Sequence, residues 1–487
     1  MPYMELVVLM PLVASAISFL FRRWGRLPAL ATMLISAITF AFVTLLCWNV
    51  YLNGPMERGI WYVDELSGIF VMLIAIVSFA VSIYSYGYVA RDIGSGHMDA
   101  DGEWQYYALL NLFVPIMLLT CMVSSFGLLW IAIEATTLVS AFLVGFYRRQ
   151  DSTEAAWKYL MICSVGITMA LVGIALVYAA SIGVLIEEGS ALDFPILYNI
   201  SDSLNPDIMR VAFVFMFIGF GTKMGLVPMH TWLPDAHSQA PTPISALLSA
   251  TLLNCALYGM IRLKMIIDIA VPDLSQGFFI GFGALSLILA ALFIMRSRDI
   301  KRMFAYSSIE HMGIIMIGLG IGTQLAIFGA LFHVIAHSIL KSFTFLSVGN
   351  VVSEYGTRDM GEIRGLREGM PFSASMLTLG TLAMVGVPPF AIFTGEALII
   401  YGALSAENYL VAVAMVIAML MVFAGSLRNI APMMSGEPPE DVHEVRGWTR
   451  KAPLVALLAI GLFLGLFMPD QLRGLIDILA MLIGGLT

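Results

Sequence analysis

Charged residues are scarce in this chain, and their scarcity excludes most classes of soluble protein. Only 12% of the 487 residues are Asp, Glu, Lys or Arg, whereas 60% are hydrophobic. An average soluble domain carries about twice that charged share. No basic patch exists outside short loops, which excludes nucleic acid as a partner. Apolar runs of roughly 20 residues, the length that crosses a bilayer, recur along the whole sequence. The sequence therefore predicts an all-α, polytopic membrane protein with little soluble mass.

Cysteine is also rare, and motifs for cofactors are missing. The four cysteines stand alone in separate apolar runs, and no two have the spacing of a metal or redox motif. The glycine run "GLGIG" (318–322) lies inside an apolar stretch with no βαβ pattern around it, so it is not a dinucleotide loop. We expect no cofactor, metal or redox site in this chain. We expect helix-packing roles for Cys47, Cys121, Cys163 and Cys255.

The hydrophobic runs predict about 14 membrane spans. Their approximate limits are 4–21, 28–52, 66–90, 106–123, 125–146, 157–181, 207–233, 242–266, 276–296, 300–320, 325–350, 372–401, 406–434 and 451–468. A final apolar piece, 471–486, is too short to cross comfortably, and we expect it to pack at the surface.

Lysine and arginine collect in alternate loops. One set of loops holds Arg22, Arg23, Arg26, Arg91, Arg148, Arg149, Arg296, Arg298, Lys301, Arg302, Arg358, Arg364, Arg367, Arg446, Arg450 and Lys451. The opposite set holds only Arg58, Arg210, Arg262, Lys264 and Arg473. Because cytoplasmic loops carry the excess of Lys and Arg, we expect both termini on the outer side of the membrane.

Two of the predicted spans carry helix-breaking residues near their middles. The seventh contains "GTKMGLVP", which ends at Pro228, and the twelfth contains "MVGVPPFAIFTGE", with Pro388 and Pro389. A proline inside a span removes a backbone hydrogen bond, and the freed groups must find partners in protein or water. We therefore predict broken helices near 223–228 and 386–395.

The two breaks occupy equivalent places in two sets of five spans. Each break falls in the fourth span of its set, and an odd number of spans reverses the topology. The sets are therefore predicted to be inverted repeats of the kind that surround transporter ion paths. The predicted units are 1–105 with the first three spans, 106–266 as the first repeat, 267–434 as the second repeat, and 435–487 with the last span and the apolar tail.

Several ionisable residues fall inside the predicted spans. Each costs about 2.5–3.5 kcal/mol on insertion scales, so each needs a reason. They are Glu134 in the fifth span, Lys223 in the seventh, Glu310 and His311 near the start of the tenth, His333, His337 and Lys341 in the eleventh, and Glu396 after the break in the twelfth. The three residues of the eleventh span are spaced four apart, which places them on one helical face.

Each of these residues also has a purely structural interpretation. Glu134 and Lys223 could form one structural ion pair, the histidines could be neutral core residues, and Glu310 and His311 could be hydrated at a membrane face. The HxxxH spacing could hold zinc, but no third ligand is evident in the nearby sequence. Taken together, carboxylate, ammonium and imidazole groups on several spans favour a proton relay, in which each group titrates beside a partner whose charge moves its pKa.

Three segments carry a resemblance to a known family. They are "WIAIEATTLVSAFLVG" (130–145), "GFGTKMGLVPMHTWLPDAHSQAPTPISALLSA" (219–250) and "RDIKRMFAYSSIEHMG" (298–313). These segments resemble the antiporter-like proton-channel subunits of respiratory complex I. Those subunits are related to large Mrp sodium/proton antiporter subunits and to membrane subunits of group 4 nickel–iron hydrogenases. Within the family, "EAAWKYLMICSVG" (154–166) and "VGNVVSEYGTRDM" (348–360) are most similar to the hydrogenase-4 component F type.

The resemblance implies roles for the buried ionisable residues. It implies a Glu–Lys pair at Glu134 and Lys223, titratable residues on the eleventh span, and a terminal acid at Glu396. Many relatives carry a lysine in the middle of the eighth span, where this chain has Asn254. An asparagine can hold water but cannot carry a proton as charge. The central link is therefore expected to run through water near Asn254, or through His230 or His237.

The implied function is ion movement without chemistry in this chain. The resemblance implies a subunit that moves protons or sodium ions through a Glu/Lys/His relay. Redox chemistry would occur at nickel–iron and iron–sulfur centres in partner subunits of a hydrogenase or complex-I-like assembly. The expected location is the cytoplasmic (inner) membrane of a prokaryote. One alternative is an Mrp-type cation/proton antiporter subunit without a redox arm, and another is a membrane anchor whose buried charges only hold helices together.

Overall fold

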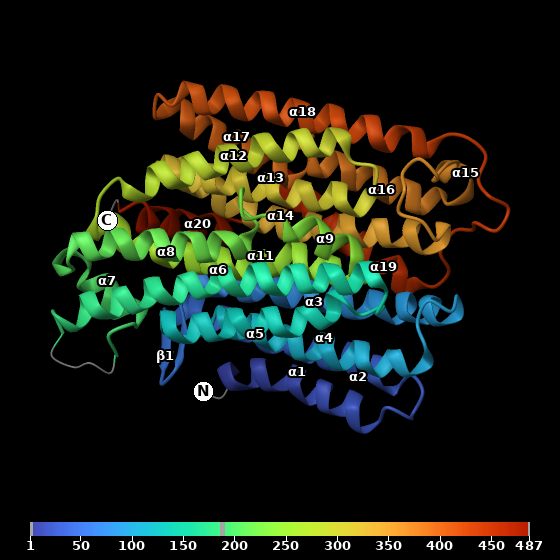
Figure 1. Ribbon diagram of the computed structural model, residues 1–487, viewed down its shortest axis with the longest axis horizontal. Coiled ribbons are helices and arrows are strands. Elements are labelled where there is room, and N and C mark those ends of the chain that lie inside the picture. Colours follow the sequence, from blue (N-terminus) through green and yellow to red (C-terminus); the bar gives the residue numbers. More distant parts are fainter. Residues whose placement is uncertain (1–2, 186–189, 486–487) are drawn as a thin grey trace.

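The computed structural model describes residues 3–185 and 190–485, and most of these residues are helical. The long helices run side by side along one direction and form a single bundle (Figure 1). Eleven helices in the described part of the chain are long and apolar enough to cross a membrane. The prediction of a polytopic α-helical protein is therefore confirmed.

The first third of the chain forms the lower part of the bundle in Figure 1. Its elements are α1 (Tyr3–Leu20), α2 (Leu27–Asn53), β1 (Met56–Arg58), β2 (Trp61–Val63), α3 (Glu65–Gly94), α4 (Ala100–Thr120), α5 (Phe126–Val144) and α6 (Gln150–Ile182). The antiparallel pair β1–β2 turns at Gly59, whose φ is +59°, and this small hairpin was not predicted.

The middle of the chain contains the first interrupted span. Its elements are α7 (Phe194–Asn199), the 3₁₀ turn η2 (Ser201–Ser203), α8 (Pro206–Met224), α9 (Trp232–Gln239), α10 (Thr242–Leu247), the π-helical turn η3 (Leu248–Leu252) and α11 (Leu253–Ala270). The π turn inside the eighth span carries no proline or glycine, and the sequence did not predict it.

The last part of the chain contains the second interrupted span. Its elements are α12 (Leu274–Arg296), α13 (Ile300–Ile321), α14 (Gln324–Tyr355), α15 (Leu366–Gly369), α16 (Pro371–Met384), α17 (Ala391–Ser405), α18 (Tyr409–Met434), the 3₁₀ turn η4 (Trp448–Arg450), α19 (Ala452–Leu466) and α20 (Asp470–Ile483). The short α20 packs one face against α14 and leaves Ile478 on its other face exposed.

Both predicted helix breaks are present. Gly225, in the left-handed conformation, ends α8, and the chain resumes as a helix only at Trp232. In the second case α16 ends at Met384 and α17 begins at Ala391. The freed backbone groups find partners, as a membrane interior requires. The Val227 N–H donates to Ser286 Oγ of α12 (2.9 Å), and Trp232 Nε1 donates to the Thr222 carbonyl (2.9 Å).

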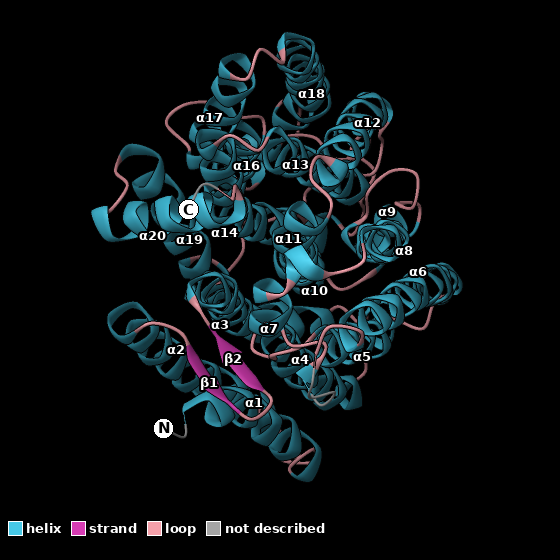
Figure 2. Cartoon of the chain, turned by 90° about the vertical axis from the view of Figure 1, so that its left-hand side faces the viewer, coloured by secondary structure: helices cyan, strands magenta, loops and turns pink. Residues whose placement is uncertain are grey.

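The centre of the bundle is occupied by the eighth, tenth and eleventh predicted spans. All of the apolar stretch within Thr242–Ala270 is buried inside the protein, and 94% of it is buried in α13 and in α14. For α1 and α2 the share is only 28%. The end-on view in Figure 2 likewise places α11 and α14 in the middle and α1, α2 and α18 at the edge. Polar side chains on α11, α13 and α14 are therefore shielded from lipid.

Candidate functional site

Lys223 lies in the last turn of α8, just before the first break, and its side chain is buried. Its ammonium donates hydrogen bonds to Thr137 Oγ1 of α5 and to the Tyr159 hydroxyl of α6, both at 2.7 Å. It also lies 4.8 Å from the centre of the Tyr159 ring. Neutral oxygens and one aromatic face thus replace the water that a lysine holds at a surface.

Glu134 and Lys223 do not form the structural ion pair that was considered as an alternative to an ion path. The described chain places no Glu134 oxygen within the 4.0 Å of Lys223 Nζ that an ion pair requires. One Glu134 oxygen accepts a hydrogen bond from Ser164 Oγ (2.7 Å), and the other is buried without a partner. Thr137, one turn further along α5, contacts the Lys223 ammonium where a carboxylate would lie in an ion pair.

The predicted row on α14 is present, and it faces a second row on α13. His333, His337 and Lys341 are all buried on one side of α14. His311 of α13 lies between the two histidines, with ring centres 5.1 Å from His333 and 5.3 Å from His337. Lys341 Nζ donates to Ser307 Oγ, one turn before His311, at 2.9 Å. We call these two facing sets of side chains the α13–α14 row.

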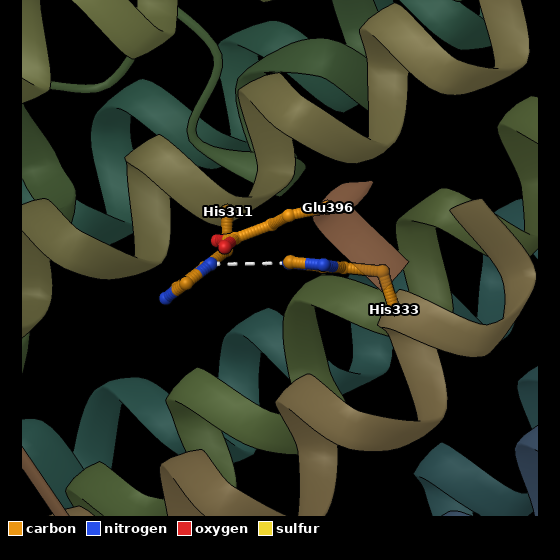
Figure 3. Close-up of side chains that lie close together, drawn as sticks. All are labelled: His311, His333 and Glu396. Carbon is orange, nitrogen blue, oxygen red and sulfur yellow. Dashed lines mark hydrogen bonds between the residues drawn. The ribbon is translucent and has the colours of Figure 1, made fainter. Parts of the chain in front are cut away.

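Glu396 lies at one end of the α13–α14 row. Figure 3 shows its carboxylate pointing toward His311 and His333, whose Nδ1 and Nε2 atoms are 3.1 Å apart. Each of the three residues offers one potential ligand atom, and these atoms lie within 4.8 Å of one another. Beside His333, His311 and Glu396 therefore supply two more donor atoms of the kinds that bind zinc. The sequence alone did not reveal them. Because the two imidazoles are hydrogen-bonded to each other, the same geometry also suits proton exchange between them.

Glu310 and His311 were considered as hydrated residues at a membrane face, and this interpretation is wrong. Both are buried, with exposed fractions of 1% and 0%. Glu310 interacts with the Ser307 hydroxyl, which also receives the Lys341 hydrogen bond, and its Oε2 has no partner in the described chain. The predicted repeat could have identified Glu310 as a candidate functional residue, because Glu310 lies on the second span of its set, as Glu134 does.

Asn254 connects the centre of the bundle to α14. Its amide nitrogen donates to the Ala250 carbonyl (2.8 Å) and to Ser338 Oγ (2.7 Å), next to His337. Its amide oxygen is buried without a partner among the described residues. The π turn η3 precedes it directly, and π turns inside helices often mark functional positions. Ser249 in that turn pairs with Ser308 of α13 at 2.7 Å.

The two candidate histidines of the first break lie in different surroundings. His237 is buried, stacks on Phe345 of α14 with ring centres 5.5 Å apart, and has no hydrogen-bond partner at either ring nitrogen within the described chain. His230 is only partly buried and lies beside Phe293 of α12, with ring centres 6.1 Å apart. Of the two, His237 is the one directed at the α13–α14 row.

The cysteines form no disulfide among the described residues. Cys121, Cys163 and Cys255 are buried, Cys47 is partly buried, and all four are free thiols. Close helix contacts instead depend on glycine. A Cβ on Gly219 of α8 would lie 2.5 Å from the Cβ of Ala170 on α6. Small residues of this kind let membrane helices approach closely, and here they hold Lys223 against α6.

Comparison with known proteins places this arrangement in a family. The profile described as "NADH:quinone oxidoreductase/Mrp antiporter, TM" matches residues 106–422, and the complex I chain 5 N-terminus profile matches residues 60–97. The hydrogenase-4 component F homolog of Methylacidiphilum infernorum is 36% identical over 385 residues, which cover 79% of this chain and 81% of that one.

Solved structures share the fold along the whole chain. A chain of the membrane-bound sulfane sulfur reductase, an archaeal respiratory membrane complex, matches with a TM-score of 0.88 and 24% identity, covering 99% of this chain and 98% of that one. A chain of the Mrp complex from Dietzia sp. matches with a TM-score of 0.86 and 18% identity, covering 100% and 98%.

The interrupted spans and the buried ionisable residues between them define a multi-pass membrane subunit of the antiporter-like class. Its buried charges are consistent with ion translocation. The chain belongs to the NADH:quinone oxidoreductase/Mrp antiporter family, which confirms the resemblance carried by the three sequence motifs. Its relatives are subunits of multi-subunit membrane complexes.

Proposed function

We propose that this chain translocates protons or sodium ions as a membrane subunit of a hydrogenase or complex-I-like oxidoreductase. In this proposal the chain lies in the cytoplasmic membrane of a prokaryote, with both termini outside. Nickel–iron and iron–sulfur centres in partner subunits supply the energy. The observation that carries the proposal is the line of buried polar groups from Lys223 past Asn254 to Glu396, in which several atoms have no partner within the described chain.

The line divides into two parts that differ in how they hold a proton. In the first part, Lys223 keeps its proton while the Glu134 charge acts on it, and gives it up when that charge is drawn away. Lysine suits this role because, unlike arginine, it can lose its proton when buried. The hydroxyls of Thr137 and Tyr159 hold the amine in place in both states.

The second part passes the proton along the α13–α14 row. Asn254 and Ser338 connect the two parts by hydrogen bonding, with water carrying the proton between them. Lys341 and Glu310 meet at Ser307, and His337, His311 and His333 lead on to Glu396. Glu396 thus ends the line, next to the second helix break.

The ion and the energy source can be tested together in inverted membrane vesicles that contain the whole complex. We expect ion uptake to require redox turnover, and a pH gradient to form in sodium-free buffer if protons are the coupled ion. The likeness to the Mrp complex favours the antiporter as the second candidate. Sodium/proton exchange driven by an imposed gradient, with no redox substrate present, would support that antiporter and contradict the redox-coupled proposal.

Gly386, in the second break, should be essential for placing Glu396. Its φ of +67° lies in the left-handed region that favours glycine, and a Cβ there would collide with the Glu396 carboxylate. We expect Gly386→Ala to displace the carboxylate, to lower ion uptake, and to destabilise the protein by roughly 1–3 kcal/mol through backbone strain. Gly59→Ala is the matched control, because Gly59 also has a positive φ (+59°) and a Cβ there meets nothing within 4 Å. Normal uptake by Gly386→Ala would remove Glu396 from the ion path.

A further inference from the structure

A cavity of about 480 Å³ opens at the end of the bundle that holds the basic loops. Its walls come from the end of α3, the start of α6, the α9–α10 turn, the α12–α13 turn and the end of α14. The lining is strongly polar and includes Asp92, Tyr147, Ser238, Lys301, Thr357 and Arg358. The positive-inside rule assigns this end to the cytoplasm. We call this space the basic-side cavity.

Two buried charged residues line the basic-side cavity without an ion-pair partner among the described residues. Asp92 is 4% exposed and accepts a hydrogen bond from the Tyr147 hydroxyl at 2.5 Å. Lys301 is 2% exposed, and its ammonium donates to the Ala240 carbonyl. A buried charge with no direct ion-pair partner is costly. Both side chains line one cavity of about 480 Å³, which has room for several water molecules.

Lys301 stands between the cavity and the interior of the protein. Ala240, which accepts its hydrogen bond, ends the short helix α9, and His237 lies on that helix one turn earlier. His237 is buried, and neither of its ring nitrogens has a hydrogen-bond partner among the described residues. His237 also stacks on Phe345, one turn from Lys341 on α14. Lys301, His237 and Lys341 therefore form a sequence of titratable groups that leads from the cavity to the α13–α14 row.

We propose that the basic-side cavity is the mouth through which protons enter from the cytoplasm, with Lys301 as its inner gate. This inference rests on the proposed function and names both the ion and its entry point. The Lys301 ammonium passes a proton to a free ring nitrogen of His237, from which the proton continues to Lys341. A proton from water in the cavity then restores the charge of the Lys301 amine. A lysine at the gate can carry a proton on its own nitrogen, whereas its charged form repels a sodium ion.

A thiol placed in the mouth tests this entry route after the complex has assembled. Thr357 lines the cavity, and Ser435 is exposed on the loop that follows α18, outside the cavity. Thr357→Cys and Ser435→Cys are each treated with a bulky cationic methanethiosulfonate reagent on inverted vesicles, where the cytoplasmic face is outward. We expect modification to lower proton uptake per electron at least roughly tenfold in Thr357→Cys only. Lys301→Met should show a similar loss without any reagent.

The outcome separates this inference from the proposed function. Lys223→Ala, measured in the same vesicles, reports on ion movement through the line itself. Lost uptake in Lys223→Ala together with normal uptake in Lys301→Met and in modified Thr357→Cys would overturn the entry route and leave the proposed function standing. Normal uptake in Lys223→Ala would contradict the proposed function as well. Equal inhibition of Thr357→Cys and Ser435→Cys by the reagent would also overturn the entry route.

Discussion

Replacing Lys223 with alanine is expected to lower ion uptake by roughly 100-fold or more, the usual range for loss of a proton-transfer group, while the complex still assembles. The ammonium is held by two hydroxyls rather than by a carboxylate. Its removal therefore leaves no buried counter-charge in direct contact. Tyr159 keeps its hydrogen bond with Ser140 Oγ at 2.6 Å. Uptake is measured in inverted vesicles under redox turnover, and assembly is measured by the yield of purified complex.

Two further variants distinguish loss of the titrating group from loss of charge or of packing. Lys223→Arg keeps a positive charge but cannot release its proton, so we expect it to be as inactive as Lys223→Ala. Arg210→Ala removes a basic residue from the same helix, where Arg210 forms an exposed ion pair with Asp207. Exposed ion pairs contribute little, so this control should behave as wild type. Full uptake by Lys223→Arg would mean that Lys223 acts only as a fixed charge.

Replacing Glu310 with glutamine is expected to cause the second-largest loss, again roughly 100-fold in ion uptake. The two halves of the line share one local feature, because in each the lysine ammonium donates to a hydroxyl that lies three residues from a glutamate. Thr137 follows Glu134 by three residues and contacts Lys223, whereas Ser307 precedes Glu310 by three residues and contacts Lys341. Glu310 is thus proposed to control the proton on Lys341 as Glu134 does for Lys223.

Glutamine suits this test because it keeps the size and hydrogen-bonding capacity of the side chain and removes only its titration. Glu407→Gln, at an exposed glutamate between α17 and α18, is the control for the substitution itself. A wild-type rate of uptake in Glu310→Gln, measured at the same redox turnover, would show that Glu310 has only a structural role. The Glu310→Gln side chain still fits beside Ser307, so we expect normal assembly.

The sequence predicted the helix breaks correctly because the residues that cause them act locally. Gly225 and the proline pair Pro388–Pro389 interrupt helices through their own backbone geometry and missing N–H groups. The π turn at 248–252 carries no such residue, and it depends on contacts such as Ser249 with Ser308 of α13. The β1–β2 hairpin was missed because each of its strands has only three residues.

Which side chains meet between helices was harder to predict. The spacing of His333, His337 and Lys341 placed them on one face of the helix. All three contact α13, through His311 or Ser307, as that placement requires. Periodicity along one helix does not say which helix faces it, so the contact of His333 with His311 was not foreseen. The hydroxyls that contact the Lys223 ammonium were not foreseen either, because their positions depend on the packing of α5 against α6.

The most direct test of the buried line is the number of ions moved per electron pair by the purified complex in proteoliposomes. It should be measured side by side for wild type, Lys223→Ala and Glu310→Gln. If the line carries the ions, both variants should lose the part of this ratio that the subunit contributes. Their assembly and cofactor content should be unchanged. An unchanged ratio in both variants would contradict the account, and the buried charges would then serve only to hold the helices together.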